Sequence, residues 1–350
     1  MSVLDYEKLL ALSPYSLGKA EKRALYNECL ALLCKHHSEH CCPYGKLVNV
    51  LGSNPALPVR LFKEYELKSC GDKDIIKIMT SSGTTGQQVS KIYLDKDTSS
   101  RQTKALVKIV SDFTGKSRMP MLVIDSSAVI KNRNMFSARG AGILGFSMLG
   151  RDITYALDEE MNINWNAVNG FCEKYEGQEV LLFGFTYMIW LHFFLPLQKS
   201  GKKLAVKGTM IHGGGWKKLV DMQVSAEQFR SSLKSVTELD KVLNYYGMVE
   251  QTGSIFMECE HGHLHSSVFS DIDILRTSDF SSAEIGEKGI IKLTSLLPTS
   301  YPGHILLSED EGAVIGEDDC PCGRKGKYFE IYGRIKGAEI RGCSDTYERR

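Results

Sequence analysis

The sequence predicts an α/β protein with layered, parallel-rich sheets, helices and a smaller β-rich subdomain. The first observation is that short apolar runs alternate with helical stretches from Ile75 onward, which is typical of a largely parallel sheet. The second is a change after Gly253, where short strands, turns and glycines indicate mostly antiparallel pairing. The third is the length of 350 residues, which favours one large or two closely joined lobes over one small core.

The elements follow in order along the chain. Residues 1–50 have apolar side chains at helical spacing, so we expect residues 1–56 to form an N-terminal helical segment that ends in a proline-marked connector. Residues 57–252 are the expected α/β core, with strand-like runs at 74–80, 120–127, 179–185 and 203–215. Residues 253–350 are the expected β-rich subdomain and hinge-like tail, with strand-like runs at 263–276, 289–295 and 304–315.

Composition and charge argue against several kinds of partner. The chain has 43 basic and 42 acidic side chains and no basic stripe, so we expect no nucleic-acid partner. The first residues have no basic region before a long apolar run, and ten cysteines without a secretory signal favour a reducing, cytoplasmic location. The apolar run at 180–197 approaches membrane-spanning length, but four residues interrupt it, namely Gly184, Thr186, His192 and Pro196. A buried strand followed by a buried helix from about Thr186 explains the run better, so we expect no membrane span.

A loop of small residues, SSGTTG at 81–86, lies between two strand-like segments. Its backbone N–H groups and hydroxyls can converge on one phosphate, and its glycines permit a close approach. It is not the Walker pattern, because no Gly-Lys-Ser/Thr follows, and a plain hairpin turn is the alternative. Lys91 follows the loop and could add a charge, although a lysine at a strand edge is usually just solvated.

Three further segments carry groups suited to a nucleotide. Three consecutive glycines at 213–215 allow a flat ligand to lie against the bare backbone, or simply form a strand-to-helix turn. In the segment 244–254, Tyr246 offers a ring for stacking and Glu250 offers a carboxylate for a metal ion. Asp310 stands just before an expected glycine turn and could bind two vicinal hydroxyls, although acidic turns are common.

Cysteines and histidines in two segments have the composition of a structural zinc site. One segment supplies Cys259 with histidines at positions 261, 263 and 265, and the sequence CPCGR supplies Cys320 and Cys322. One cysteine and one histidine from the first segment, with both thiols of the second, would make a four-ligand site. The alternative is a surface turn rich in histidine beside unrelated cysteines.

Five motifs in a fixed order carry a resemblance to a known family. SSGTTG, GGG, YGxxEQ, the acidic residue before glycine, and GRxKxxxxRG resemble the adenylate-forming acyl- and aryl-ligase superfamily. Within it, residues 57–344 most resemble the acyl-protein synthetase of the bacterial luminescence system (LuxE-type), and next the phenylacetate–CoA ligases. The resemblance implies the large domain of an adenylate-forming ligase, with the C-terminal lid absent or truncated.

The resemblance also implies site residues. It places around the ATP phosphates Ser81, Ser82, Gly83, Thr84, Thr85 and Gly86. It places beside the nucleotide base Gly213, Gly214, Gly215, Tyr245, Tyr246 and Gly247. It assigns Mg²⁺ to Glu250, the ribose hydroxyls to Asp310, and the ribose or α-phosphate side to Arg334. Lys336 is hinge-like and stands among the expected catalytic residues, and Lys91 replaces the lysine of the absent Gly-x-Pro-Lys.

The resemblance further concerns the acid, the acceptor and zinc. Residues 183–188 fall where the family lines its acyl pocket, and their apolar, aromatic character suits an apolar or aromatic acid. Cys343 in a matching GCS is the implied acyl acceptor, and Arg341 beside it would favour the thiolate. Phenylacetate–CoA ligase-like proteins are similar in both cysteine segments, which favours His265 as the fourth zinc ligand with Cys259, Cys320 and Cys322.

The sequence therefore predicts an ATP- and Mg²⁺-dependent enzyme, an acid–thiol ligase with a structural Zn²⁺. It would activate a carboxylic acid as an acyl-adenylate and pass the acyl group to Cys343, to CoA, or to a thiol carrier or acyl reductase partner. Two alternatives remain at this stage. One is a non-catalytic binding protein that keeps the fold, and the other is acyl transfer to an amine or hydroxyl in a surface-glycan or lipid pathway.

Overall fold

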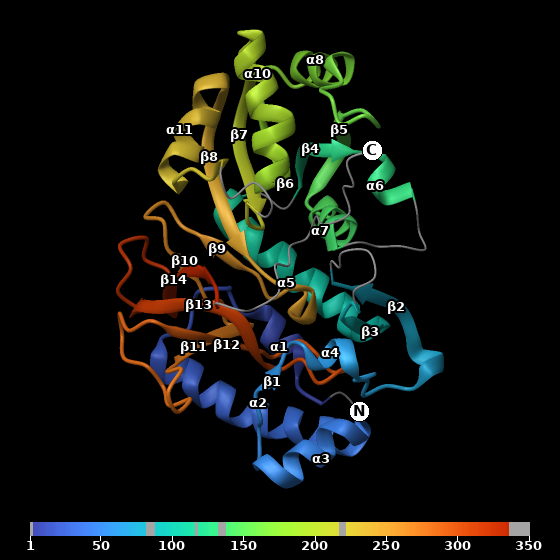
Figure 1. The fold of residues 1–350 in the computed structure, drawn as a ribbon, viewed down its shortest axis with the longest axis vertical. Coiled ribbons are helices and arrows are strands. Elements are labelled where there is room, and N and C mark those ends of the chain that lie inside the picture. Colours follow the sequence, from blue (N-terminus) through green and yellow to red (C-terminus); the bar gives the residue numbers. More distant parts are fainter. Residues whose placement is uncertain (1–2, 82–87, 116–117, 132–137, 217–221, 336–350) are drawn as a thin grey trace. The chain divides into compact units, whose positions relative to one another are not determined.

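The computed structural model describes residues 3–81, 88–115, 118–131, 138–216 and 222–335. The chain divides into two compact units, which are described separately (Figure 1). Unit 1 contains Met1–Phe113 and Tyr246–Ile340, and unit 2 contains Thr114–Tyr245 and Arg341–Arg350. The expected boundaries after residues 56 and 252 stay a prediction.

Unit 1 begins with the predicted helices, α1 (Tyr6–Ala11), α2 (Lys19–His40) and α3 (Cys42–Leu51). The helix α2 begins where Glu21 accepts a hydrogen bond from the backbone N–H of Gly18 at 3.1 Å, which satisfies one of the free donors of the first turn. Other elements of the first half are β1 (Leu57–Pro58), α4 (Leu61–Glu64), η1 (Asp72–Asp74), β2 (Ile75–Thr80), β3 (Lys91–Asp95) and α5 (Lys96–Thr114). The helices expected within residues 1–50 are present, and their grouping as a segment 1–56 stays a prediction.

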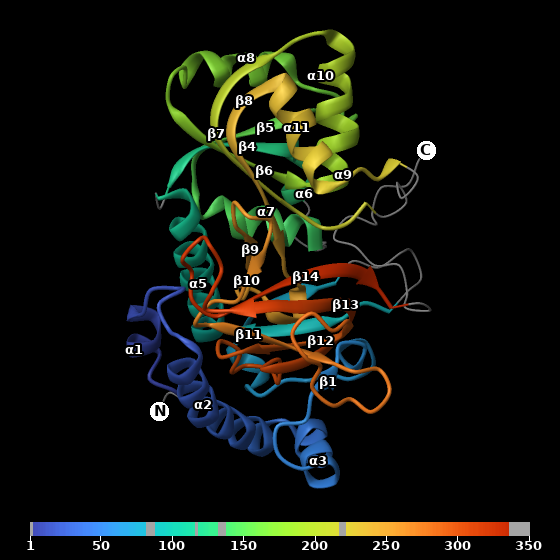
Figure 2. The same ribbon diagram turned by 90° about the vertical axis from the view of Figure 1, so that its left-hand side faces the viewer.

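The second half of unit 1 is an antiparallel sheet, as predicted. Its strands run in the order β11-β12-β13-β14-β10-β9, and β1 adds in parallel to β13. Their bounds are β9 (Phe256–Glu258), β10 (Leu264–His265), β11 (Ser270–Leu275), β12 (Gly289–Ser295), β13 (Ile305–Glu317) and β14 (Lys327–Arg334). One face is apolar and forms a core from Phe256, Leu264, Ile272, Ile274, Ile291, Leu293 and Phe329. Figure 2 shows these strands from the side.

Unit 2 is built on a parallel sheet with the strand order β8-β7-β6-β4-β5. The strands are β4 (Met119–Ser126), β5 (Gly150–Leu157), β6 (Glu179–Phe185), β7 (Leu204–Gly213) and β8 (Thr237–Tyr246). The helices are α6 (Ala128–Lys131), α7 (Ala138–Ser147), α8 (Trp165–Lys174), α9 (Thr186–Met188), α10 (Leu195–Ser200) and α11 (Ala226–Val236), with a π-helical turn η2 (Ile189–Phe194). The central strands β4 and β6 are almost entirely buried, which is why each contains a continuous apolar run, 121–124 in β4 and 180–183 in β6. The three tryptophans of the chain, Trp165, Trp190 and Trp216, all belong to this unit.

The apolar run at 180–197 is a strand and then a helix, as expected. β6 ends at Phe185, and the helical turns α9, η2 and α10 follow without a long straight helix. Within the described residues, no helix combines the length and the apolar character that crossing a bilayer requires.

One open alternative is decided, and one expectation is wrong. The hairpin considered for the SSGTTG segment is present, because β2 pairs with β3 in a separate antiparallel sheet and the loop between them is too short for a parallel crossover. Asp310 was expected just before a glycine turn, but it lies inside β13. The next glycine, Gly312, follows a shift in register, and a Cβ there would lie 2.4 Å from the carbonyl oxygen of Glu330.

Candidate functional site

In unit 1 the pairing of β13 with β14 brings an acidic and a basic candidate together. Asp310 lies directly opposite Arg334, and Arg334 Nε is 3.5 Å from Asp310 Oδ1. Arg334 Nη1 also donates to Glu309 Oε2 at 3.0 Å. The hydroxyl of Tyr246, at the end of β8, donates to Asp310 Oδ2 at 2.7 Å. Three residues singled out by the sequence, Tyr246, Asp310 and Arg334, are therefore joined by one hydrogen bond and one ion pair, and we call them the Asp310 cluster.

The Asp310 cluster is polar and partly open to solvent. Burial, and secondly the Asp310 carboxylate, raises the pKa of Tyr246 well above its ordinary value, so this hydroxyl remains a donor at any physiological pH. The side chains of Arg334 and Asp310 are 34% and 16% exposed. A carboxylate has more acceptor sites than Tyr246 occupies, so ligand hydroxyls can still bind it.

Glu250 lies in the short turn η4 (Val249–Gln251) of unit 1 and is 6% exposed. The neighbouring Gln251 donates from Nε2 to the carbonyl oxygens of Gly303 at 2.9 Å and Leu293 at 3.3 Å, which fixes the turn against the sheet. A Cβ at Gly303 would lie 2.9 Å from the carbonyl oxygen of Glu250, so only glycine allows this close approach. The backbone that carries Glu250 is thus held firmly in place.

The described ends of the SSGTTG loop form the base of a hairpin. Ser81 Oγ accepts from the backbone N–H of Ser90 at 2.9 Å, and the N–H of Ser81 donates to the carbonyl of Ser90 at 3.1 Å. Lys91 is exposed and pairs with Thr80 across the hairpin. The hairpin is therefore confirmed, while phosphate binding by the loop stays a prediction.

Several predicted site residues lie outside the described residues, namely Ser82, Gly83, Thr84, Thr85, Gly86, Lys336, Arg341 and Cys343.

In unit 2 the three glycines differ from one another. The ring of Tyr245 covers Gly213, where a Cβ would lie 2.4 Å from the ring. Gly214 has a φ of +77°, a conformation that glycine adopts readily, and it begins the turn. Among the described residues no atom lies within 4 Å of a Cβ built on Gly215. The bare backbone expected for a flat ligand is therefore found at Gly215, and at Gly213 the protein's own ring takes that space.

Residues 183–188 are buried among aromatic side chains. Phe183 stacks on Phe146 with ring centroids 4.2 Å apart, and Phe185 is 1% exposed. Thr186 is the polar exception, and its hydroxyl lies 3.0 Å from His212 Nδ1 and 3.1 Å from the carbonyl oxygen of Gly213. His212 is not among the predicted site residues, although its place at the end of a strand-like run and before three glycines was a usable signal.

The sequence analysis also missed a buried ion pair in unit 2. Asp125 is 1% exposed at the end of β4, and its Oδ2 lies 3.0 Å from Nε of Arg139 on α7. Burial raises the pKa of Asp125 to about 6, although Arg139 acts in the opposite direction. The polar pair of residues after a run of buried apolar ones, at 125–126, was the available signal.

The predicted zinc ligands come together in unit 1. The ligand atoms of Cys259, His265, Cys320 and Cys322 all lie within 4.8 Å of one another. The Sγ atoms of Cys259 and Cys320 are 4.0 Å apart, and Cys322 Sγ is 3.4 Å from His265 Nε2. Ligands of a tetrahedral zinc stand about 3.5 to 3.8 Å apart, given bond lengths of about 2.0 to 2.3 Å. The spacing and the donor types therefore fit zinc.

Two tight turns position this Cys–His cluster. Gly262 with a φ of +82° follows Cys259, and Gly323 with a φ of +79° follows Cys322. The backbone N–H of His261 points at Cys259 Sγ at 3.4 Å. Three members are deeply buried, with exposed fractions of 2% for Cys259, 0% for His265 and 4% for Cys320. Burial raises the pKa of the Cys259 and Cys320 thiols and lowers the pKa of His265 to about 4.

Nine of the ten cysteines lie in the described residues, and each of these is a free thiol. His263 Nδ1 also lies 3.4 Å from Cys320 Sγ, but the four-membered set contains His265.

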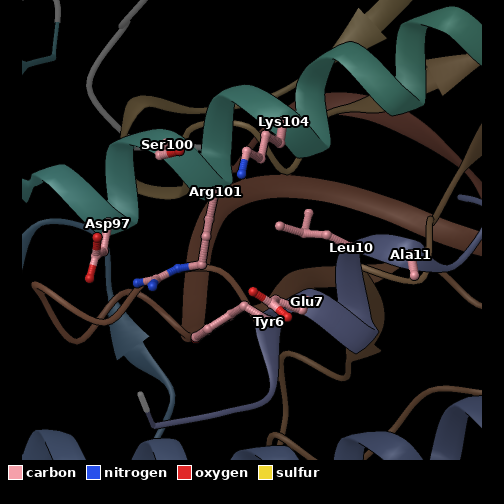
Figure 3. Close-up of a pocket in the computed structure, with 8 residues that line it drawn as sticks. All are labelled: Tyr6, Glu7, Leu10, Ala11, Asp97, Ser100, Arg101 and Lys104. Atoms are coloured by element: carbon pink, nitrogen blue, oxygen red, sulfur yellow. The ribbon is translucent and has the colours of Figure 1, made fainter. Parts of the chain in front are cut away.

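A separate cavity of about 410 Å³ lies between α1 and α5 in unit 1 (Figure 3). Arg101 and Lys104 extend from α5 toward α1, and the Arg101 guanidinium stacks 3.9 Å from the ring centroid of Tyr6. Glu7 and Asp97 also line it, so its charges are mixed. None of its lining residues is among the predicted site residues.

Comparison with known proteins decides the family. The family model described as acyl-protein synthetase, LuxE, matches residues 2–350. This chain belongs to the LuxE family of acyl-protein synthetases. As a member of this family, the chain is an enzyme of the acid–thiol ligase class, as the motifs predicted. It is 23% identical over 313 residues to the long-chain-fatty-acid–luciferin-component ligase of Vibrio harveyi, covering 86% of this chain and 79% of that one. The same ligase of Aliivibrio fischeri is 22% identical over 299 residues, covering 83% and 76%.

Solved structures support the fold. An open conformation of 2-hydroxyisobutyryl-CoA ligase, in complex with 2-HIB-AMP and CoA, matches with a TM-score of 0.67 and 13% identity over 93% of this chain and 77% of that chain. The same ligase in the postadenylation state matches with a TM-score of 0.65 and 13% identity over 92% and 69%. At this identity the likeness concerns the fold alone, and it confirms the predicted fold class.

Proposed function

We propose that this LuxE-family enzyme uses ATP and Mg²⁺ to activate an apolar carboxylic acid and then passes the acyl group to a thiol. The Asp310 cluster is the observation that carries the proposal. It offers a partly exposed carboxylate for vicinal ribose hydroxyls and a guanidinium for the α-phosphate side, both held in place by strand register. The family assignment supports the same chemistry.

The reaction has two steps. A carboxylate oxygen attacks the α-phosphorus of ATP, and pyrophosphate leaves with the electron pair of the broken P–O bond. A thiolate sulfur then attacks the acyl carbon, a thioester forms, and AMP leaves. In the first step negative charge develops on the phosphate oxygens, where Arg334 on β14 would stabilise it.

The metal ion has one assigned ligand. Glu250 would hold Mg²⁺, which neutralises charge on the phosphates. A carboxylate oxygen is the donor type that Mg²⁺ prefers, and the turn η4 keeps the Glu250 backbone fixed through Gln251. In unit 2, Gly214 and Gly215 would border the base.

The acid is proposed to be apolar. The segment 183–188 contains no charged side chain, and it contributes the buried apolar side chains of Phe183, Phe185 and Met188. Relatives of this chain bear a name that specifies long-chain fatty acids. A panel from acetate to long-chain and aryl acids would define the preferred length.

The acceptor thiol is proposed to be Cys343, with CoA and a carrier or reductase thiol as competitors. Incubation with ATP and labelled acid should give a hydroxylamine-labile adduct on the protein. The adduct should disappear in Cys343→Ala and persist in the matched control Cys172→Ala. An adduct that survives Cys343→Ala contradicts self-acylation, and acyl-CoA formed without an adduct favours direct transfer.

Acid-dependent exchange of pyrophosphate into ATP tests the whole proposal. Exchange should appear only with the preferred acids and should require Mg²⁺. A folded protein that binds ATP but shows no exchange with any acid would instead support a non-catalytic binding protein. Transfer from a formed adenylate to an amine or hydroxyl, with no thioester, would support the remaining alternative.

We also propose that the Cys–His cluster holds a structural Zn²⁺. Three thiols and one imidazole with suitable spacing are its donor set, and the metal would tie the segment of β9 and β10 to the turn between β13 and β14. Metal analysis of purified protein should give about one zinc per chain, and a metal-free, fully folded protein would contradict this proposal.

A further inference from the structure

A single hydroxyl in unit 2 connects the segment proposed to line the acid with the glycines proposed to border the base. Thr186 begins α9, directly after Phe185, the last residue of β6. Its Oγ1 lies 3.1 Å from the carbonyl oxygen of Gly213, the last residue of β7. The same atom lies 3.0 Å from Nδ1 of His212. Thr186 and His212 are 6% and 7% exposed, so solvent offers them little competition.

The hydrogen count decides the direction of both bonds. A carbonyl oxygen only accepts, so the single hydroxyl proton of Thr186 goes to Gly213. Thr186 Oγ1 must then accept from His212, which places a proton on Nδ1 and leaves the lone pair on Nε2. The threonine thereby fixes both the tautomer of His212 and the carbonyl that starts the glycine turn.

The imidazole stays neutral throughout the working range. Burial, and secondly the charge of Arg230, lowers the pKa of His212 to about 3. Its ring also lies against Phe229 with centroids 4.6 Å apart, which restricts its rotation. The two hydrogen bonds are therefore permanent features at neutral pH.

We propose that Thr186 is a positioning residue that sets the turn Gly213–Gly215 for nucleotide binding, a role that rests on the proposed function. Gly214 in this turn has a φ of +77°, and the hydrogen bond from Thr186 to the carbonyl oxygen of Gly213 is a side-chain contact that fixes the start of the turn. Residue 186 belongs to the segment that lines the acid, so acid binding and the geometry of the base site share one side chain.

The kinetic test compares variants that differ by one functional group. Thr186→Val keeps the shape and loses both hydrogen bonds, whereas Thr186→Ser keeps the hydroxyl. The valine variant should raise KM for ATP about tenfold in the pyrophosphate exchange assay, with kcat changed far less, and the serine variant should stay near wild type. Thr209→Val, a buried threonine on the same strand β7 with no assigned role, is the matched control. A KM for ATP unchanged in Thr186→Val, in an enzyme with normal wild-type exchange, would overturn the inference.

The second test does not depend on activity. In glycine- and histidine-labelled full-length protein, nitrogen NMR should show a protonated Nδ1 on His212. Thr186→Val should shift the amide resonances of Gly214 and Gly215, whereas Thr209→Val should not. Unmoved glycine resonances would overturn the inference whatever the kinetics show. Absent exchange in a wild-type protein with the expected resonances would instead be a failure of the proposed function alone.

Discussion

In unit 1 the candidate residues are charged groups paired across antiparallel strands, whereas in unit 2 they are uncharged groups at the carboxyl ends of parallel strands. Asp310 and Arg334 are partly exposed, so water still hydrates both charged groups, and a ligand can replace some of this water. Thr186 and His212 are buried, and a neutral pair avoids the cost of burying charge. We therefore expect substitutions in the Asp310 cluster to act on the charges that face the ligand, and substitutions at Thr186 and the glycines of unit 2 to act on local geometry.

The largest expected effect concerns the Cys–His cluster of unit 1. Cys320→Ser should lose the bound zinc and lower the free energy of unfolding by about 4 kcal/mol, if free zinc stands about a thousandfold above its dissociation constant. Metal content and thermal unfolding measure the two changes. Cys172→Ser, a half-buried cysteine of unit 2, should keep both values. Zinc retained by Cys320→Ser would remove this residue from the ligand set.

The second effect is chemical. Asp310→Asn should reduce kcat/KM for ATP in pyrophosphate exchange about a hundredfold, or about 2.7 kcal/mol, because the amide loses the charge that faces Arg334 and two acceptor sites. Glu311→Gln changes the next residue, which pairs with Lys288 at 2.7 Å, and should leave exchange intact. Equal losses in both variants would mean that general charge matters, not the Asp310 cluster.

The third effect tests the contrast within the glycines of unit 2. Gly213→Ala should destabilise the protein by about 2 kcal/mol, because its methyl group would lie 2.4 Å from the Tyr245 ring. Gly215→Ala meets no described atom within 4 Å and should barely change stability, while raising KM for ATP. Urea unfolding and exchange kinetics separate the two outcomes. Identical behaviour of the two variants would refute the distinction.

The smallest effect concerns pH. Burial lowers the pKa of His304 in unit 1 to about 3, and its stacked neighbour His37 is also shifted well below its ordinary value. The unfolded chain therefore binds more protons than the native one below about pH 6.5, so stability is complete above that pH and falls as the pH drops toward the native pKa. Each such histidine should cost about 1 kcal/mol between about pH 6.5 and 5.5.

Variants at two histidines can check this dependence. His304→Gln should reduce the loss of unfolding free energy between these two pH values, and the exposed His40→Gln should not. Urea unfolding followed by circular dichroism at both pH values gives the comparison. An unchanged pH dependence in His304→Gln would show that the native fold does not lower the pKa of this histidine.

Most helices and strands could be predicted from the sequence, because the apolar patterns that indicate them involve residues close together in the chain. The run at 179–185 is mostly apolar after Glu179 and became the central parallel strand β6, and the run at 289–295 became β12 with the same bounds. The prediction of a turn after Asp310 was wrong. Gly312 is needed there because two strands approach each other closely, and in the sequence such a glycine looks the same as a glycine in a turn. Strand pairing at long range decides between the two.

The parts of the candidate site that could be predicted are those whose residue types themselves indicate the chemistry, as cysteines and histidines indicate a metal site. The residue types selected Cys259, Cys320 and Cys322 with one of three histidines, the resemblance to phenylacetate–CoA ligases favoured His265, and the fold brings the four together. The Thr186–His212 contact could not be found, because a threonine and a histidine 26 residues apart meet only when β6 and β7 align in register. The periodicity of apolar residues predicts which face of a helix or strand is buried, but it does not predict how two strands align with each other.

The placement of the three indole side chains gives the molecule an internal optical reporter. Trp165, Trp190 and Trp216 all lie in unit 2, so fluorescence excited selectively at tryptophan reports the unfolding of that unit alone. Unit 1 contains tyrosines but no tryptophan, and it gives no signal at this excitation wavelength. A thermal unfolding curve recorded by tryptophan fluorescence can therefore be compared with one recorded by far-ultraviolet circular dichroism, which follows the backbone of both units. Coincident curves would mean one cooperative transition, and separated curves would give each unit its own stability.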